Sequence, residues 1–105
     1  MNQYDIVIVG LDPTVGAEMT KTRPCVVVSP DEMNGALRTV QVAPLTTNRR
    51  SYPWRVPIGF QRRKGMVALD QIRTIDKKRV SRKVGKASPR VVQAVKAVIQ
   101  EMLVL

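Results

Sequence analysis

Arg23 is the residue of this sequence whose chemistry and position best suit a phosphate group. It lies between a polar loop and an apolar run that begins at Pro24, and functional residues are often carried by loops held on such scaffolds. Because proline restricts the residue before it to extended geometry, Pro24 helps to fix the backbone at Arg23. A guanidinium donates two parallel hydrogen bonds to a phosphate. Arg23 is therefore a candidate phosphate ligand, and the alternative is a surface charge at the start of a strand.

Three more residues carry groups that act on phosphates or protons. Thr46 and Thr47 follow an apolar run and open a basic loop. Their hydroxyls can donate to a phosphate oxygen or can simply form a turn. Glu18 is a carboxylate in the polar loop before Arg23. It can act as a base, pair with Arg23 or remain solvated.

Residues 48–54 interleave cations with aromatic rings. The segment contains Arg49, Arg50, Tyr52 and Trp54. Proteins hold single-stranded nucleic acid in this way, by charge along the backbone and by stacking on the bases. The alternative places Trp54 in the core and leaves the arginines solvated.

The composition restricts the chemistry further. The chain has no histidine and one cysteine, so the usual zinc sites and the commonest general base are missing. We therefore expect no metal and no cofactor. Catalysis would have to use carboxylates, hydroxyls, Arg, Lys or Tyr. Cys25 lies in an apolar run and is expected to be a buried thiol.

The charge of the chain is concentrated in one part of the sequence. The formal net charge is +10, and residues 49–86 contain thirteen basic and two acidic residues. Such a block predicts a polyanionic partner, most commonly nucleic acid. The alternative is a solvated basic face that favours solubility. No apolar run approaches the roughly 20 residues that span a bilayer, and no leader precedes the first apolar run, so a cytoplasmic protein with no membrane contact is expected.

The elements that must hold these residues are short strands and one helix. Ser88 and Pro89 form an N-cap followed by proline at the first helical position, and apolar residues recur at helical spacing from Val91 to Leu103. We expect a hairpin-like connection at 30–35, a charged turn at 62–65 and a bend at Asp70. Strands are predicted at 5–11, 24–29, 39–43, 54–56, 66–69 and 71–75. These elements predict one domain, residues 1–105, that is mainly β, with a small barrel-like sheet and a C-terminal helix.

Four stretches, in this order along the chain, resemble the MazF/PemK toxin family, which includes the Kid toxins. The first two are residues 5–18 (DIVIVGLDPTVGAE) and 22–29 (TRPCVVVS), and the others are 43–47 (APLTT) and 69–77 (LDQIRTIDK). Each motif alone is weak, but four in order are specific. The chain departs from the family at Tyr4, where a glycine is usual, and at Met19, where glutamine is frequent.

The resemblance implies an SH3-like antiparallel barrel of the CcdB/PemK type with a C-terminal α-helix, assembled as a homodimer. It implies a sequence-preferring, metal-independent endoribonuclease toxin that cleaves single-stranded RNA, often messenger RNA. The products would carry a 2′,3′-cyclic phosphate and a 5′-hydroxyl. It also implies a cognate MazE-like antitoxin whose acidic, disordered tail blocks the RNA site.

The resemblance also implies roles for individual residues. The family's catalytic arginine and threonine correspond to Arg23 and Thr46, and the acidic residue of its loop corresponds to Glu18. The RNA-binding residues that we predict are Thr47, Arg49, Arg50, Tyr52, Trp54 and Gln71. Two alternatives remain: a CcdB-type toxin that binds DNA gyrase on the same fold, against which Arg23 and Thr46 argue, and a noncatalytic SH3-like RNA-binding module.

Overall fold

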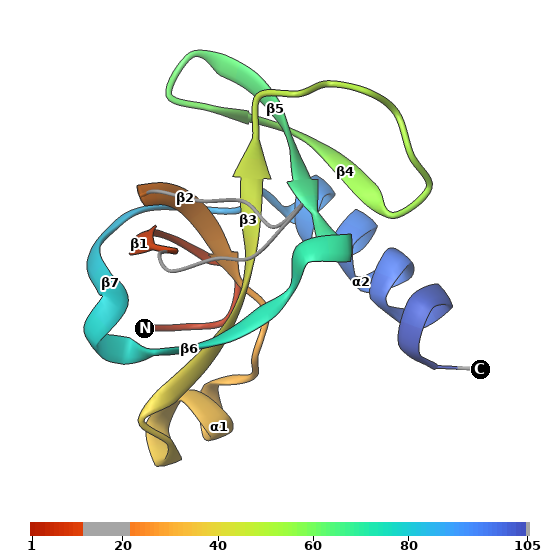
Figure 1. Cartoon of the computed structure of the whole chain (residues 1–105). Helices are drawn as coiled ribbons and strands as arrows, with labels where there is room; N and C mark the ends of the chain where they lie inside the picture. Colours follow the sequence, from red (N-terminus) through yellow and green to blue (C-terminus); the bar gives the residue numbers. More distant parts are fainter. Residues whose placement is uncertain (12–21, 105) are drawn as a thin grey trace.

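A computed structural model describes residues 1–11 and 22–104 of the chain (Figure 1). The described part is mainly β and ends in a long helix, which confirms the predicted fold class. The helices are α1 (Asp31–Ala36) and α2 (Pro89–Leu103), with short 3₁₀ turns at η1 (Leu69–Gln71) and η2 (Lys77–Arg79). The strands are β1 (Asp5–Gly10), β2 (Thr22–Val27), β3 (Thr39–Thr46), β4 (Arg55–Phe60), β5 (Arg63–Ala68), β6 (Arg73–Asp76) and β7 (Val80–Lys86).

The strands form one curled antiparallel sheet in the order β4-β5-β3-β2-β1-β7, with β6 also paired to β3. Strand β3 organises the sheet, because β6 pairs with its first half and β5 with its last two residues. Figure 1 shows β3 running from α1 at one end to the β4–β5 hairpin at the other. The outer strands β4 and β7 approach each other near Phe60 and Gly85, where a Cβ on Gly85 would lie 3.3 Å from the Phe60 ring. The sheet is therefore a half-barrel.

Side chains on the two faces of the sheet bury separate core clusters, because successive residues of a strand point to opposite faces. Ile6 and Val26 belong to the first cluster, together with Val91 and Val95 of α2. The second cluster lies on the opposite face and contains Val7, Val9, Leu11, Cys25, Val27, Val40, Val42 and Ile75. Since both faces of β1 and β2 are covered, these strands appear in the sequence as continuous apolar runs.

The predicted start of the last helix is confirmed. The Ser88 hydroxyl accepts a hydrogen bond from the Val91 N–H at 3.3 Å, and Pro89 occupies the first helical position. The apolar face packs against the core through its first turns. Met102 and Leu103, at the end of the same face, are 38% and 67% exposed because the helix extends beyond the sheet. None of the described helices has both the length and the apolarity needed to cross a membrane.

Three predictions about local structure were wrong. Residues 30–35 are not a hairpin, because Asp31–Ala36 forms helix α1, with the Asn34 side chain buried against Ser29. The charged turn at 62–65 is mostly strand, since only residues 61 and 62 form the turn. Strand β7 was missed because its sequence is largely polar and its side chains are largely exposed. It is a strand because it pairs with β1.

Tyr4 occupies a backbone conformation that glycine adopts more easily. Its φ is 70°, in the left-handed region where a Cβ is unfavourable. Its N–H donates to Val27 O at 2.6 Å, and its carbonyl accepts from Ala87 N at 2.9 Å. The ring packs against the first core cluster, and burial raises the pKa of its hydroxyl. The chain thus keeps a glycine-like turn and adds an aromatic side chain to the core.

Candidate active site

A groove of about 610 Å³ lies at one end of the sheet, where β1, β3 and β4 end and β2 and β5 begin. Its floor is apolar and its rim carries hydroxyl, amide and cationic groups. The residues that line it are Ile8, Thr22, Arg23, Pro24, Leu45, Thr46, Thr47, Ile58, Phe60, Gln61, Arg63, Lys64 and Gly65. The volume is typical of small-molecule and substrate sites.

Arg23 and Thr46 meet at this groove through the pairing of β2 with β3. The paired residues end at Cys25 and Pro44, and the same register continued by two residues places Arg23 opposite Thr46. Pro24 and Pro44 have no N–H to donate to a ladder. The ladder between the two strands therefore ends at Cys25, and both Arg23 and Thr46 are half-buried beyond it.

Gly65 allows β5 to approach the end of β3 closely. A Cβ at this position would lie 2.6 Å from the backbone oxygen of Thr46, which is far inside van der Waals contact. Backbone atoms of a paired strand cannot move aside as a flexible side chain can. The absence of a side chain at Gly65 therefore sets the position of Thr46 relative to the hairpin.

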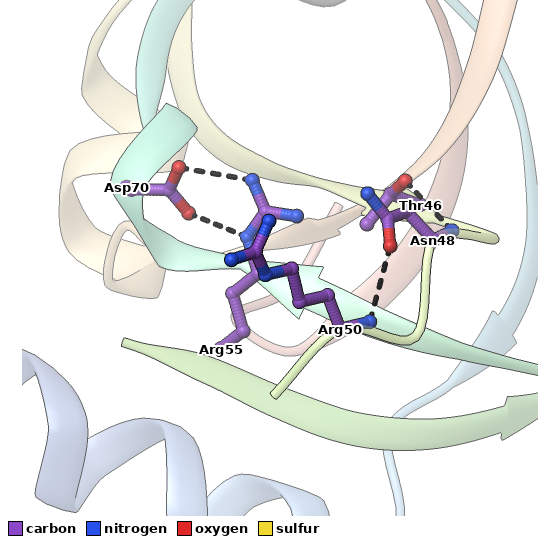
Figure 2. Close-up of polar contacts among 5 residues, drawn as sticks. All are labelled: Thr46, Asn48, Arg50, Arg55 and Asp70. Atoms are coloured by element: carbon purple, nitrogen blue, oxygen red, sulfur yellow. Dashed lines mark hydrogen bonds and ion pairs between the residues drawn. The ribbon is translucent and has the colours of Figure 1, made fainter. Parts of the chain in front are cut away.

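Hydrogen bonds within the loop after β3 fix the Thr46 hydroxyl (Figure 2). The Asn48 N–H donates to Thr46 Oγ1 at 3.2 Å, and the Arg50 N–H donates to Asn48 Oδ1 at 3.1 Å. These are the local turns that Thr and Asn side chains favour. Because Thr46 accepts in the first bond, its own hydroxyl proton is not used there.

The thiol of Cys25 lies directly behind this site. Its Sγ donates to the backbone oxygen of Arg23 at 3.7 Å, and the residue is fully buried, as the sequence predicted. Burial raises the pKa of the thiol from about 9 to about 12, against the opposing charges of Arg23 and Arg73. Arg73 is itself anchored to the carbonyl of Leu11 at 3.2 Å. Two cations thus flank a thiol that stays protonated at neutral pH.

A second group of residues, which we call the aromatic cluster, lies between the start of β4 and η1. It comprises Arg50, Tyr52, Trp54, Arg55, Asp70 and Gln71. The Tyr52 and Trp54 rings are stacked, with centroids 5.1 Å apart and planes 13° apart. The guanidinium carbons of Arg50 and Arg55 each lie 5.3 Å from the Tyr52 centroid. Figure 2 shows the Arg50 side chain extending toward Arg55 and away from Thr46.

A two-bond ion pair stabilises the aromatic cluster. Arg55 Nε and Nη2 donate to the two carboxylate oxygens of Asp70 at 3.0 and 3.1 Å. Burial alone would raise the pKa of Asp70. Hydrogen bonds from Arg55, from the backbone and from Gln71, with the Arg55 charge, outweigh it and lower the pKa below its ordinary value. The pair ties the start of β4 to η1.

The predicted site residues therefore fall into two places. Arg23, Thr46 and Thr47 line the groove. Arg50, Tyr52, Trp54 and Gln71 are in the aromatic cluster, and Arg49 is exposed in the loop between them. Trp54 is 40% exposed, so the alternative of a core tryptophan does not hold. Glu18 lies outside the described residues.

Sequence reasoning did not single out the hairpin residues that line the groove. Phe60, Gln61, Arg63 and Lys64 come from the β4–β5 hairpin. The hairpin is hard to recognise in the sequence because its two-residue turn lacks the Asn-Gly or Asp-Gly pair that usually marks such hairpins. Across residues 1–11 and 22–104, no group of three Cys, Asp or Glu side chains gathers in a way that could hold a metal ion.

The amino-acid sequence matches a known family along nearly its whole length. Residues 2–103 match the model of the PemK-like, MazF-like toxin of type II toxin–antitoxin systems. The chain is 34% identical, over 100 residues, to the endoribonuclease toxin MazF of Escherichia coli K12. That match covers 94% of this chain and 90% of the relative.

Solved structures show the same fold. MazF from Deinococcus radiodurans superposes with a TM-score of 0.88 at 25% identity, covering 100% of this chain and 97% of that one. A mycobacterial endoribonuclease in complex with its cognate antitoxin superposes with a TM-score of 0.84 at 23% identity, covering 100% and 96% of the two chains.

Proposed function

The chain belongs to the PemK-like, MazF-like toxin family of type II toxin–antitoxin systems, and we propose that it is an endoribonuclease that cleaves single-stranded RNA at preferred sequences without a metal ion. The observation that carries the proposal is the groove at which Arg23 and Thr46 come together. They lie 23 positions apart in the sequence, and strand pairing places them at one opening. The endoribonuclease name of the Escherichia coli relative supports cleavage over simple binding.

The proposed reaction is an attack by the substrate's own 2′-hydroxyl on the adjacent phosphorus. A bond forms between the 2′-oxygen and phosphorus, and the bond from phosphorus to the 5′-oxygen breaks. The 2′-hydroxyl loses its proton and the leaving oxygen gains one, which gives a 2′,3′-cyclic phosphate and a 5′-hydroxyl. Negative charge builds up on the phosphate oxygens in the transition state, so fixed donors at those oxygens are the main requirement.

Arg23 and Thr46 supply those donors in the proposal. The Arg23 guanidinium pairs with two phosphate oxygens, and Cys25 behind it stays neutral and adds no opposing charge. The Thr46 hydroxyl accepts from Asn48 and directs its own proton toward the phosphate. Glu18 is proposed to take the proton of the 2′-hydroxyl. Thr47, Arg49 and the remaining cations bind the RNA backbone.

The partners of the proposed enzyme follow from the same family. A cognate MazE-like antitoxin with an acidic tail is proposed to cover the basic groove, and the antitoxin complex of the mycobacterial relative supports this. A homodimer is also part of the proposal. Exposed Leu103 and Val104 at the end of α2 are apolar side chains that an assembly can bury. The proposed place of action is the cytoplasm, where messenger RNA is translated.

The proposal is tested with purified protein and single-stranded RNA in excess EDTA. We expect cleavage, with product masses that correspond to a 2′,3′-cyclic phosphate and a 5′-hydroxyl. An RNA with deoxyribose at the cleaved position should bind and stay intact, because it lacks the nucleophile.

Loss of cleavage in EDTA and its return with magnesium or manganese would contradict the metal-free reaction. Cleavage of the deoxyribose substrate would mean that water is the nucleophile. Inhibition of DNA gyrase without RNA cleavage would favour a CcdB-type toxin. RNA binding without cleavage, by a protein shown to be folded, would favour a noncatalytic module.

A further inference from the structure

The turn of the β4–β5 hairpin is held in a conformation that its residues do not favour. Phe60 pairs with Arg63, so Gln61 and Arg62 alone connect the strands. Their φ angles are 50° and 64°. Both positions of such a turn favour Asn or Gly, because a long side chain at positive φ is strained. A turn that served only to reverse the chain would be more stable with Asn-Gly.

The two turn residues differ in their position relative to the groove. Both are exposed, but Gln61 lines the groove that contains Arg23 and Thr46, whereas Arg62 is not among the described residues that line it. A hydrogen-bonding amide is thus held at the rim of the candidate site by a strained backbone. Strain of this kind is concentrated at functional positions.

The floor beneath Gln61 is apolar, which a phosphate does not require. It consists of Ile8, Pro24, Leu45, Ile58 and Phe60. Leu45 and Ile58 belong to the first core cluster, against which Phe60 also packs, so the core opens into the groove at this end. A flat, apolar ring face suits such a floor.

RNA supplies that ring when a base leaves its stack. Sequence-specific recognition of single-stranded RNA relies on unstacked bases that pack on apolar or aromatic side chains and form hydrogen bonds at their edges. A glutamine amide carries a donor and an acceptor side by side, and it pairs with a base edge through both. Phosphates would occupy the cationic rim at Arg23 and Arg63 while the base occupies the floor.

We infer that Gln61 is a specificity-determining residue that hydrogen-bonds to the edge of one unstacked RNA base, which packs on the floor beside Phe60. This inference rests on the proposed function, and it assigns the reading of one nucleotide to the β4–β5 hairpin. Gln61 has no part in the chemical step, which Arg23 and Thr46 carry out.

The test compares Gln61→Asn with Arg62→Asn in the full-length protein. Asparagine tolerates positive φ better than either parent residue, so both variants should melt at or above the parent temperature. Gln61→Asn shortens the amide by one methylene and withdraws it from the groove. Arg62→Asn makes the same change in turn propensity outside the groove.

Each protein is incubated with an RNA library of randomised sequence, and cut and bound molecules are sequenced separately. We expect Gln61→Asn to reduce discrimination at one nucleotide position by roughly 5-fold to 150-fold, the range for loss of a two-bond contact with a base. Cleavage should continue at sequences that the parent disfavours. Arg62→Asn should keep the parent's preference.

Identical preferences in the parent and Gln61→Asn would overturn the inference while leaving the proposed endoribonuclease intact. Equal loss of preference in Arg62→Asn would assign the effect to the turn and overturn it as well. If the parent binds the library without cutting it, the sequence preferences of the RNA bound by the parent and by Gln61→Asn are compared instead. That comparison tests the inference independently of cleavage. A parent that neither cuts nor binds RNA would refute both proposals.

Discussion

Arg23 differs from an ordinary surface arginine in its surroundings. It is half-buried just beyond the last paired residues of β2 and β3, and its backbone oxygen accepts a hydrogen bond from the Cys25 thiol. A side chain held by a rigid strand needs little reorganisation when charge develops on a phosphate, which is the property that makes a donor catalytic. The exposed Arg49 is set in a loop and has no such restraint.

Replacing Arg23 by alanine should therefore affect the rate far more than the affinity. Loss of one transition-state donor costs on the order of 10²-fold to 10³-fold in rate, and we expect RNA binding to stay within a few-fold of the parent. Arg23→Lys should restore little activity, because an ammonium lacks the planar fork. Single-turnover cleavage and RNA binding measured on the same samples separate the two effects.

Arg49→Ala is the matched control for this experiment. It should lower the salt dependence of binding by about one unit and leave the rate at saturating RNA unchanged. If Arg23→Ala cleaves saturating RNA at close to the parent rate, Arg23 is one more backbone contact and the catalytic assignment is wrong.

At the level of elements, the β4–β5 hairpin and the loop before it place the groove residues. The hairpin approaches the end of β3 at Gly65, and the Arg55–Asp70 pair anchors the start of β4 to η1. Gly65 lies in the middle of β5, opposite Ile58, and Arg55 is the first residue of β4. Together the two contacts fix the hairpin over the groove.

Gly65→Ala should displace Thr46 and destabilise the protein. The new Cβ would lie 2.6 Å from Thr46 O, and overpacking of this kind costs typically about 1 to 3 kcal/mol. Cleavage should fall together with stability, since Thr46 is the residue that must move. Gly59→Ala, on the neighbouring strand of the same hairpin, has nothing within 4 Å of its Cβ and should leave both quantities unchanged. Thermal melting and cleavage rates are measured for both variants. Equal behaviour of the two variants would refute the conclusion that β5 approaches β3 closely at Gly65.

The Arg55–Asp70 pair should make stability depend on pH in a defined direction. The pKa of Asp70 is lowered from an ordinary value of 3.8, so its contribution is present above that pH and is lost as the pH falls through the folded-state value. Because the pair is partly exposed, Asp70→Asn should cost no more than about 1 kcal/mol at neutral pH. Denaturant unfolding of parent and variant should converge well below pH 3.8. If the difference in unfolding free energy between parent and variant stays constant with pH, the charge of Asp70 does not contribute to stability.

At the scale of the whole molecule, folding distributes the basic residues of segment 49–86 over several elements. Its basic residues are spread over the loop before β4, the β4–β5 hairpin, β6, η2 and β7. Asp5 pairs with Lys83 at 3.2 Å, as Asp70 does with Arg55, so part of the charge is balanced internally. Arg62, Arg63 and Lys64 remain exposed at the hairpin that borders the groove.

An acidic antitoxin tail and RNA should therefore compete for the hairpin end of the molecule. We expect the cognate antitoxin to displace fluorescently labelled RNA, and the competition to weaken as salt rises. A peptide with the tail's composition in scrambled order is the control for charge alone and should compete less well. Simultaneous binding of antitoxin and RNA, with neither weakening the other, would rule out a shared surface.

The sequence alone determined those features of this protein whose signals are local. The Ser88–Pro89 start of α2 and the buried strands β1 and β2 follow from capping chemistry and apolar periodicity, which act over a few neighbouring residues. Arg23 and Thr46 were identifiable because each adjoins a proline-marked strand within a recognisable motif. The buried, unreactive state of Cys25 followed from the apolar run around it.

Tertiary structure alone decided which of these residues share a site. The register between β2 and β3 brings Arg23 to Thr46, and ring stacking draws Tyr52 and Trp54 into a separate cluster beside Asp70. No local sequence pattern marks strand β7 or the turn at Gln61. Strand β7 forms because β1 offers it a hydrogen-bonding edge, and the turn keeps a backbone conformation that its residues do not favour. Long-range pairing depends on the geometry of the partner, and a local pattern of residue types does not contain that information.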